Sequence, residues 1–174
     1  MRVGRISGII TMVGAVAVAG LVAQGMPDTA KAELKDAAGK SVGNVTLTET
    51  PHGVLLHVVL TDAPEGVHAF HLHTTGQCVA PFTTAGGHFN PGMKQHGAQN
   101  AMGMHAGDMP NITVPAGGKL TFDILNPDVT LKAGANSLMD ADGSAVMLHA
   151  AADDYKGYPA GNAGARIACG VVTK

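Results

Sequence analysis

The chain has 174 residues, with 11 lysines and arginines against 13 aspartates and glutamates, so its formal net charge is −2. From residue 33 onward, eight basic residues face twelve acidic ones, and no cluster of cations stands out. This balance excludes the basic surface typical of nucleic-acid-binding proteins, so we expect no nucleic-acid partner.

The N-terminus is typical of an export signal. Arg2 and Arg5 precede an uncharged stretch whose apolar part, residues 9–23, is shorter than the roughly 20 residues of a membrane span. Two short stretches, Ala23–Gly25 and Ala30–Ala32, offer small residues at the positions that a signal peptidase reads. We predict a signal peptide at 1–32 and one domain at 33–174, periplasmic or secreted, with no stable membrane association after cleavage. A retained N-terminal anchor is the alternative.

The remaining chain alternates short apolar runs with Gly, Pro, Asn and Asp turn signals, and no stretch keeps helical spacing for three turns. This pattern predicts an all-β fold, a Greek-key β-sandwich or barrel of immunoglobulin-like type with a long metal-binding loop. The expected strands are Val42–Glu49, Gly53–Leu60, Val67–His73, Lys119–Leu125, Val129–Lys132, Ala145–Leu148 and Ile167–Val172.

Two histidines stand at i and i+2 in the third of these runs. His71 and His73 therefore project from one face of a strand, where they can hold one ion together. His68 points to the opposite face and is not expected to join them. His149, at the end of another apolar run, can complete this site from a neighbouring strand.

The stretch from Thr74 to Pro110 is glycine-rich and weakly periodic, and loops of this length are commonly functional or disordered. It carries four further metal-binding side chains, which would order it by binding a metal: His88, His96, His105 and Asp108. One carboxylate with three histidines fits a tetrahedral zinc site. Seven ligands exceed the need of one four-coordinate ion, so the sequence suggests two adjacent metals that share a ligand.

The two cysteines of an exported chain predict one disulfide, Cys78–Cys169. A bridge over about 92 residues can stabilise the fold by ~4–5 kcal/mol in the chain-entropy model. The competing role is a copper thiolate, in which Cys78 would join His88 and Met93.

Four segments resemble those of copper/zinc superoxide dismutases, in the same order and collinear from about residue 33: Gly66–His73, Ala85–Pro91, His105–Asp108 and Gly161–Gly170. The longer insert between Cys78 and His88 is similar to that of bacterial exported members. The resemblance implies copper on His71, His73, His88 and His149, and zinc on His88, His96, His105 and Asp108. It also implies that His88 bridges the metals and that Asp153 links His71 to His96.

The implied reaction is the dismutation of superoxide to dioxygen and hydrogen peroxide, with copper cycling between Cu(II) and Cu(I). In this scheme His88 carries a proton to the departing peroxide, and Arg166 positions the anion. Lys156 can add electrostatic steering, for which this family is a standard example. The eukaryotic dimer interface is not implied, so the expected state is a monomer or a homodimer.

A second class of function is a periplasmic copper-binding or copper-delivery module. Four methionines lie around the predicted loop, and thioether sulfur is a soft ligand for Cu(I): Met93, Met102, Met104 and Met109. Methionine is also an ordinary filler of irregular gaps. A third possibility is a structural relative that has lost catalysis, against which the seven ligands and Arg166 argue.

Overall fold

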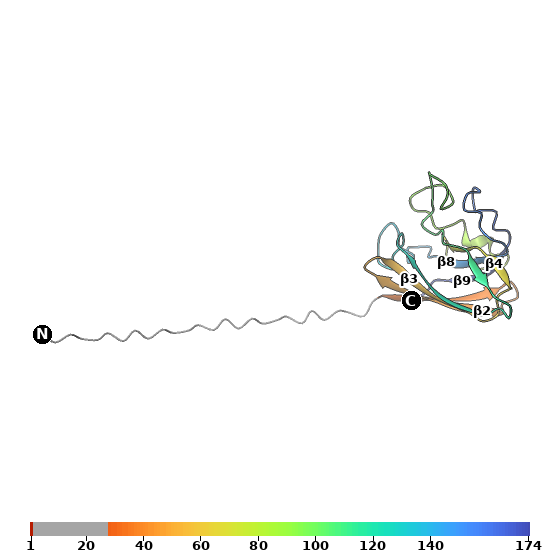
Figure 1. Ribbon diagram of the computed structural model, residues 1–174, viewed down its shortest axis with the longest axis horizontal. Coiled ribbons are helices and arrows are strands. Elements are labelled where there is room, and N and C mark those ends of the chain that lie inside the picture. The colour runs from red at the N-terminus through yellow and green to blue at the C-terminus, as the bar shows by residue number, and fades with distance from the viewer. Residues whose placement is uncertain (2–27) are drawn as a thin grey trace.

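The computed structural model describes Met1 and residues 28–174, and it confirms the all-β prediction (Figure 1). Seven antiparallel strands form one curled sheet in the order β5-β8-β9-β1-β2-β3-β7, and β4 and β6 form a separate pair. The strands are β1 (Thr29–Asp36), β2 (Ser41–Thr50), β3 (Gly53–Leu60), β4 (Gly66–His68), β5 (Phe70–His73), β6 (Ile112–Val114), β7 (Leu120–Asn126), β8 (Ala145–His149) and β9 (Arg166–Val171), with one short 3-10 helix, η1 (Thr83–Ala85).

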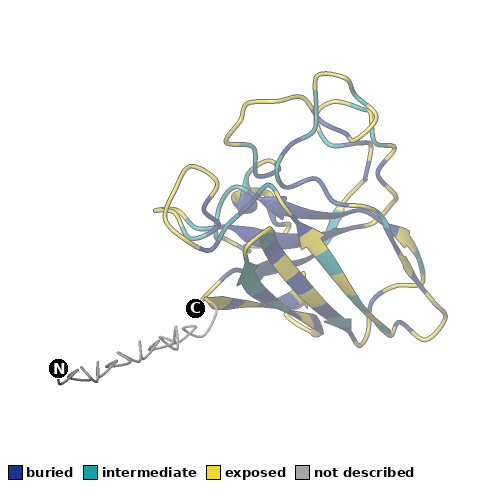
Figure 2. Cartoon of the chain, turned by 60° about the vertical axis from the view of Figure 1, so that its left-hand side comes forward, coloured by how far each residue is buried: buried dark blue, intermediate teal, exposed yellow. Residues whose placement is uncertain are grey.

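Successive residues of β1, β2 and β3 alternate between buried and more exposed positions. In Figure 2 this alternation appears as blue and yellow bands across strands of the sheet. Leu34, Leu47 and Leu56 are fully buried on the inner side. Strands β5 and β8 are buried on both sides, because the loops at one end of the barrel cover their outer face. The metal-ligand candidates of these two strands therefore lie under a cover of loops, away from bulk water.

The predicted strand Val67–His73 is two strands in the structure. Ala69 leaves the ladder, since its N–H donates to the Ala151 carbonyl and its own carbonyl accepts from the His149 N–H. Residues before it pair with β6, which the sequence prediction missed, and residues after it pair with β8. At Ala69 the chain therefore passes from the separate β4–β6 pair to the edge strand of the seven-stranded sheet.

The predicted strand Val129–Lys132 was wrong. Val129 and Leu131 are both buried, which produced the alternating pattern. Two N–H groups of this segment donate to side chains instead of a neighbouring strand: Leu131 N–H to the Glu49 carboxylate and Lys132 N–H to the Thr130 hydroxyl.

Most of the predicted signal peptide lies outside the described residues. Of its last residues, Thr29–Ala32 begin β1, which the prediction missed. Ala30 and Ala32 are buried, this part of β1 pairs with β2, and Lys31 exchanges two backbone hydrogen bonds with Thr173. Within residues 28–174, no helix has the length and apolar character needed to cross a membrane.

Two long loops rise from the same end of the barrel, the green loop after β5 and the blue loop after β8 (Figure 1). The first is fixed along the free edge of β5 by backbone bonds: Leu72 N–H donates to Gly107, Phe89 N–H to Leu72 and Thr74 N–H to Gly87. The loop predicted from residues 74–110 thus has backbone order of its own, in addition to whatever metal binding contributes.

Candidate metal centre

The first cluster, here called the four-histidine group, gathers His71 and His73 from β5, His149 from the end of β8 and His88 from the loop. One ring nitrogen from each lies within 4.8 Å of the others, and all four residues are buried. Strand register explains the meeting, because β5 pairs directly with β8 and the backbone of His88 bridges that of His73.

The second cluster, here called the aspartate group, comprises His88, His96, His105 and Asp108. Its ligand atoms also lie within 4.8 Å of one another, and its residues are also buried. All four come from the loop along β5. His88 belongs to both groups, and its ring centroid lies 4.0 Å from that of His71 and 5.1 Å from that of His96.

Hydrogen bonds on the outer side of the rings decide which nitrogen faces inward. His73 Nδ1–H donates to the Gly86 carbonyl at 3.0 Å, and His71 Nε2–H donates to Asp153 Oδ2 at 2.9 Å. A neutral imidazole has one N–H, so the other nitrogen of each ring carries a lone pair. These lone pairs, His73 Nε2 and His71 Nδ1, are directed into the four-histidine group.

Four buried ring nitrogens make no hydrogen bond: His71 Nδ1, His88 Nε2, His105 Nδ1 and His149 Nδ1. Buried polar atoms almost always have a partner, and each exception needs a cause. Two of these atoms, His71 Nδ1 and His88 Nε2, belong to the four-histidine group, where His149 Nε2 also stands only 3.4 Å from His73 Nε2. Lone pairs so concentrated fit a bound cation, and imidazole is a good ligand for copper and zinc.

The aspartate group offers the ligand set of a tetrahedral zinc site, and two of its three oxygen–nitrogen separations are close to those of such a site. Asp108 Oδ1 lies 2.7 Å from His88 Nδ1, 3.1 Å from His96 Nδ1 and 3.3 Å from His105 Nδ1. Zn–N bonds of 2.0–2.1 Å give ligand–ligand edges of about 3.3 Å in a tetrahedron. The other oxygen, Oδ2, is held outside by the N–H groups of Gly97 and His105 at 2.9 and 3.0 Å.

His96 adds a separate argument for a cation. Its Nε2 lies 2.9 Å from Asp153 Oδ1 while its Nδ1 lies 3.1 Å from Asp108 Oδ1. A neutral ring can donate to only one of these carboxylates, so the other contact needs a positive charge between the nitrogen and the oxygen, which a metal ion or a second ring proton supplies. A metal between His96 Nδ1 and Asp108 meets that need.

Comparison with known proteins agrees with this geometry. Residues 41–172 match the family copper/zinc superoxide dismutase (SODC). The superoxide dismutase [Cu-Zn] 2 of Aquifex aeolicus (strain VF5) is 49% identical over 146 residues, covering 82% of this chain and 85% of the relative. That of Caulobacter vibrioides is 45% identical over 148 residues, covering 83% and 85%. A double mutant of a superoxide dismutase-like protein from Bacillus subtilis superposes with a TM-score of 0.80 at 42% identity, covering 83% and 97%.

The chain belongs to the copper/zinc superoxide dismutase family. It is an oxidoreductase that converts superoxide to dioxygen and hydrogen peroxide, with copper and zinc as its metals. The fold prediction and the predicted activity are therefore confirmed.

Burial keeps three histidines of this superoxide dismutase neutral and ready to bind metal. It lowers the pKa of His73 to about 2, with further repulsion from His88 and Arg166. Burial and the neighbouring His71 lower the pKa of His149 to about 3. For His88, burial lowers the pKa to about 4 although Asp108 opposes the shift.

The two carboxylates remain ionised. Burial would raise the pKa of Asp108, but the imidazoles of His105 and His88 and the Gly97 N–H outweigh it and hold that pKa well below its usual range. Burial likewise opposes ionisation of Asp153, yet the bonds from His71 and His96 lower its pKa to about 2. Two fixed negative charges thus stand beside the two ligand groups.

Arg166 begins β9 and turns its guanidinium toward the loop that carries η1. Its two terminal nitrogens donate to the carbonyls of Phe82 and Gly86, each at 2.6 Å. Gly86 accepts from His73 as well. The Gly86 carbonyl therefore fixes the position of Arg166 relative to His73 of the four-histidine group.

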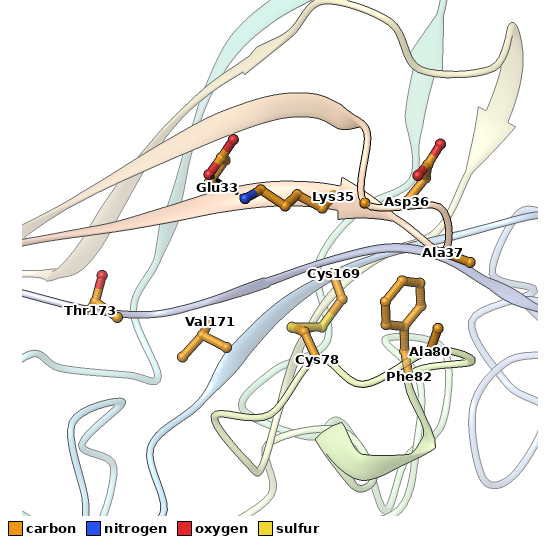
Figure 3. A pocket seen from close by; sticks show the side chains of 11 residues that line it. Glu33, Lys35, Asp36, Ala37, Cys78, Ala80, Phe82, Cys169, Val171 and Thr173 are labelled. Carbon is orange, nitrogen blue, oxygen red and sulfur yellow. Dashed lines mark ion pairs between the residues drawn. A yellow bond between two sulfur atoms is a disulfide. The ribbon is translucent and has the colours of Figure 1, made fainter.

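The disulfide Cys78–Cys169 is present, with a Cα–Cα distance of 5.6 Å, which excludes the copper-thiolate alternative. Figure 3 shows it beside Phe82, at the wall of a pocket bounded above by β1. The bridge joins the start of the loop to β9, three residues from Arg166. It therefore holds together the two segments between which Arg166 forms its hydrogen bonds.

The three remaining histidines lie outside both groups, as predicted for His68. His52 lies in the exposed turn between β2 and β3. His57 is exposed and contacts Asp123 at 2.7 Å. His68 is buried, but its nitrogens contact the carbonyls of His149 and Pro64 at 2.8 and 3.0 Å.

Sequence reasoning missed three residues that fix Asp153. The side chain of Asn111 bonds both the N–H and the carbonyl of Asp153, at 2.8 and 2.9 Å, and Tyr155 N–H donates to Asp153 Oδ1 at 2.7 Å. Gly161 lies against the Asp153 carboxylate with no room for a Cβ. Only the position of Tyr155, two residues after Asp153, offered a local signal.

Proposed function

We propose that the four-histidine group, His71, His73, His88 and His149, binds copper, and that the aspartate group, His88, His96, His105 and Asp108, binds zinc. The observation that carries the assignment is chemical. The first group offers four nitrogens and no anion, while the second offers a carboxylate oxygen that lies 2.7, 3.1 and 3.3 Å from three nitrogens. Nitrogen-only sites suit copper, and three histidines with one carboxylate suit zinc.

When bound, copper supplies the reversible one-electron chemistry by which one superoxide is oxidised and the next is reduced, and zinc supplies a fixed charge. His88 Nε2 is the atom of this chain that takes up a proton and passes it to the departing peroxide. Its other nitrogen, Nδ1, stays beside Asp108, so the ring keeps its position while Nε2 gains and loses the proton.

Arg166 attracts and positions the anionic substrate. It is half-buried, and its charge acts on the four-histidine group strongly enough to lower the pKa of His73, after burial and His88. Its two bonds to Phe82 and Gly86 fix the guanidinium in one orientation. Asp153 orients His71 and His96 through their outer nitrogens, as carboxylates beside metal-bound imidazoles generally do.

The disulfide supports the placement of this protein in an oxidising compartment. We propose that it is periplasmic or secreted, free of stable membrane association after removal of a signal peptide. The end of that signal is better placed before Thr29 than after Ala32, because a cut at 32 would remove half of β1 and its buried Ala30. Each chain carries both complete ligand groups, so the site suits a monomer or a homodimer.

The copper-delivery alternative is not favoured. Met93 and Met102 are 90% and 70% exposed, but Met109 packs in the hydrophobic core. Met109 is therefore not available to a copper site shared with the two exposed methionines.

The test is to load purified protein with both metals, measure copper and zinc per chain, and follow superoxide decay in the same samples. One copper and one zinc per chain with rapid decay is expected. Copper binding without decay would favour delivery, and absence of metal binding would overturn the proposal.

A further inference from the structure

We propose that Tyr155 is a positioning residue, which holds the Asp153 carboxylate between His71 and His96 and thereby couples zinc retention to the geometry of the copper ligands. The inference rests on the proposed function, because it takes these two histidines as ligands of different metals.

Tyr155 is bonded at three of its polar groups, each to a different segment. Its N–H donates to Asp153 Oδ1 at 2.7 Å. Its carbonyl accepts from Gln99 N–H at 3.1 Å, and its phenol oxygen accepts from Asn111 N–H at 2.8 Å. Gln99 lies between the zinc ligands His96 and His105, and Asn111 follows Asp108 by three residues. Tyr155 is therefore a point where the loop after β8 rests on the loop after β5.

Asn111, which donates to the Tyr155 phenol oxygen, also bonds Asp153. It stands three residues after Asp108, and its side chain bonds the backbone of Asp153 through both its oxygen and its nitrogen. Asp153 is thus held at its backbone by Asn111 and at its carboxylate by Tyr155 N–H. Because Tyr155 also holds the N–H of Asn111, loss of the phenol oxygen would loosen both supports of Asp153.

The backbone of Tyr155 indicates that its side chain has a role. Its φ is 62°, in the left-handed region that a bulky residue rarely adopts and that glycine or asparagine would occupy more easily. Its neighbour across the contact, Gly97, has no room for a Cβ because the Tyr155 carbonyl lies against it. Gly97 N–H in turn donates to Asp108 Oδ2, so a shift of Tyr155 reaches the zinc carboxylate directly.

The chain offers a matched pair of variants, since Tyr155 and Tyr158 are its only tyrosines. Tyr158 is 75% exposed and serves as the control. Tyr155→Phe removes one hydrogen-bond acceptor and keeps the ring, so zinc affinity should fall by about 3- to 10-fold, the factor that one net hydrogen bond is worth. Tyr158→Phe should leave it unchanged. Affinity is measured on copper-free, disulfide-intact protein by competition with a chromophoric chelator.

A second readout separates positioning from a general loss of stability. In protein carrying both metals, the Cu(II) paramagnetic resonance spectrum of Tyr155→Phe should differ from wild type, because His71 is oriented through the same carboxylate. Asn111→Ala should shift both measurements in the same direction, and combining it with Tyr155→Phe should give less than the sum of the two changes in binding free energy.

Zinc affinity and a copper spectrum equal to wild type in Tyr155→Phe would overturn the inference, even if the metal-free variant unfolded more easily. So would full additivity of the two variants. If the wild-type protein itself fails to bind zinc, the proposed function fails, which is a separate result.

Discussion

Replacing Asp153 by asparagine should weaken zinc binding by about 10- to 100-fold, the usual effect of altering a group that orients metal-bound imidazoles. In the structure the two carboxylate oxygens accept from two different rings, Oδ2 from His71 and Oδ1 from His96, each at 2.9 Å. An asparagine amide has one oxygen, so its NH2 group must face one of these N–H donors. One ring then loses its partner and its orientation, at a cost of ~1.4–2.7 kcal/mol for the stated factors.

The assay is a zinc titration against a competing chelator, with the copper spectrum recorded in parallel. Asp123→Asn is the matched control, because Asp123 is exposed on β7 and also contacts a histidine, His57. The control should bind zinc like wild type. If Asp153→Asn also binds zinc with wild-type affinity and leaves the copper spectrum unchanged, the linking role of this carboxylate is refuted.

Three further results are expected. Arg166→Glu should lower the second-order rate by about 10-fold or more at low salt and weaken its salt dependence; an equal loss of copper would show instead that the residue maintains the metal site. Reduction of Cys78–Cys169, which spans 91 residues, should lower the free energy of unfolding of the metal-free protein by up to ~4–5 kcal/mol in denaturant titrations. Two free thiols in protein recovered from the oxidising compartment would reject the bridge. The metal-free protein should lose stability as pH falls from about 6.5 toward 4. His73, His88 and His149 have lowered pKa values when folded, so the unfolded chain takes up protons more readily. A thermal unfolding temperature that is constant over this pH range would contradict the burial argument.

Local periodicity predicted those parts of the fold in which side chains alternate over several residues. β2 and β3 were found because apolar residues recur at every second position and turn residues bound them. β1 was missed, since its buried positions are mostly alanine and it directly follows an apolar segment. Val129–Lys132 is the opposite case, because its residues alternate like a strand but do not form one. Two of its backbone N–H groups donate to the side chains of Glu49 and Thr130 instead of to a neighbouring strand.

The residues of the candidate site carried a strong sequence signal because metal ligands belong to few residue types. The spacing of His71 and His73 fixed a shared face, and the resemblance supplied the pairing with distant residues. Asn111 carried no such signal, and Tyr155 carried only its position two residues after Asp153. They act through hydrogen bonds between a side chain and the backbone across 42 and 44 residues, which follow from how two loops pack rather than from any pattern along the chain.

The most direct test of the account is whether His88 joins the two metals. Zinc is replaced by a second Cu(II), and the paramagnetic resonance signal is recorded for wild type and for His88→Ala. A bridging imidazole, with Nε2 in the four-histidine group and Nδ1 beside Asp108, should couple the ions and abolish the ordinary Cu(II) signal in wild type, while His88→Ala should restore it. Two independent copper signals in the wild-type di-copper protein would contradict the bridge and the proton transfer assigned to His88.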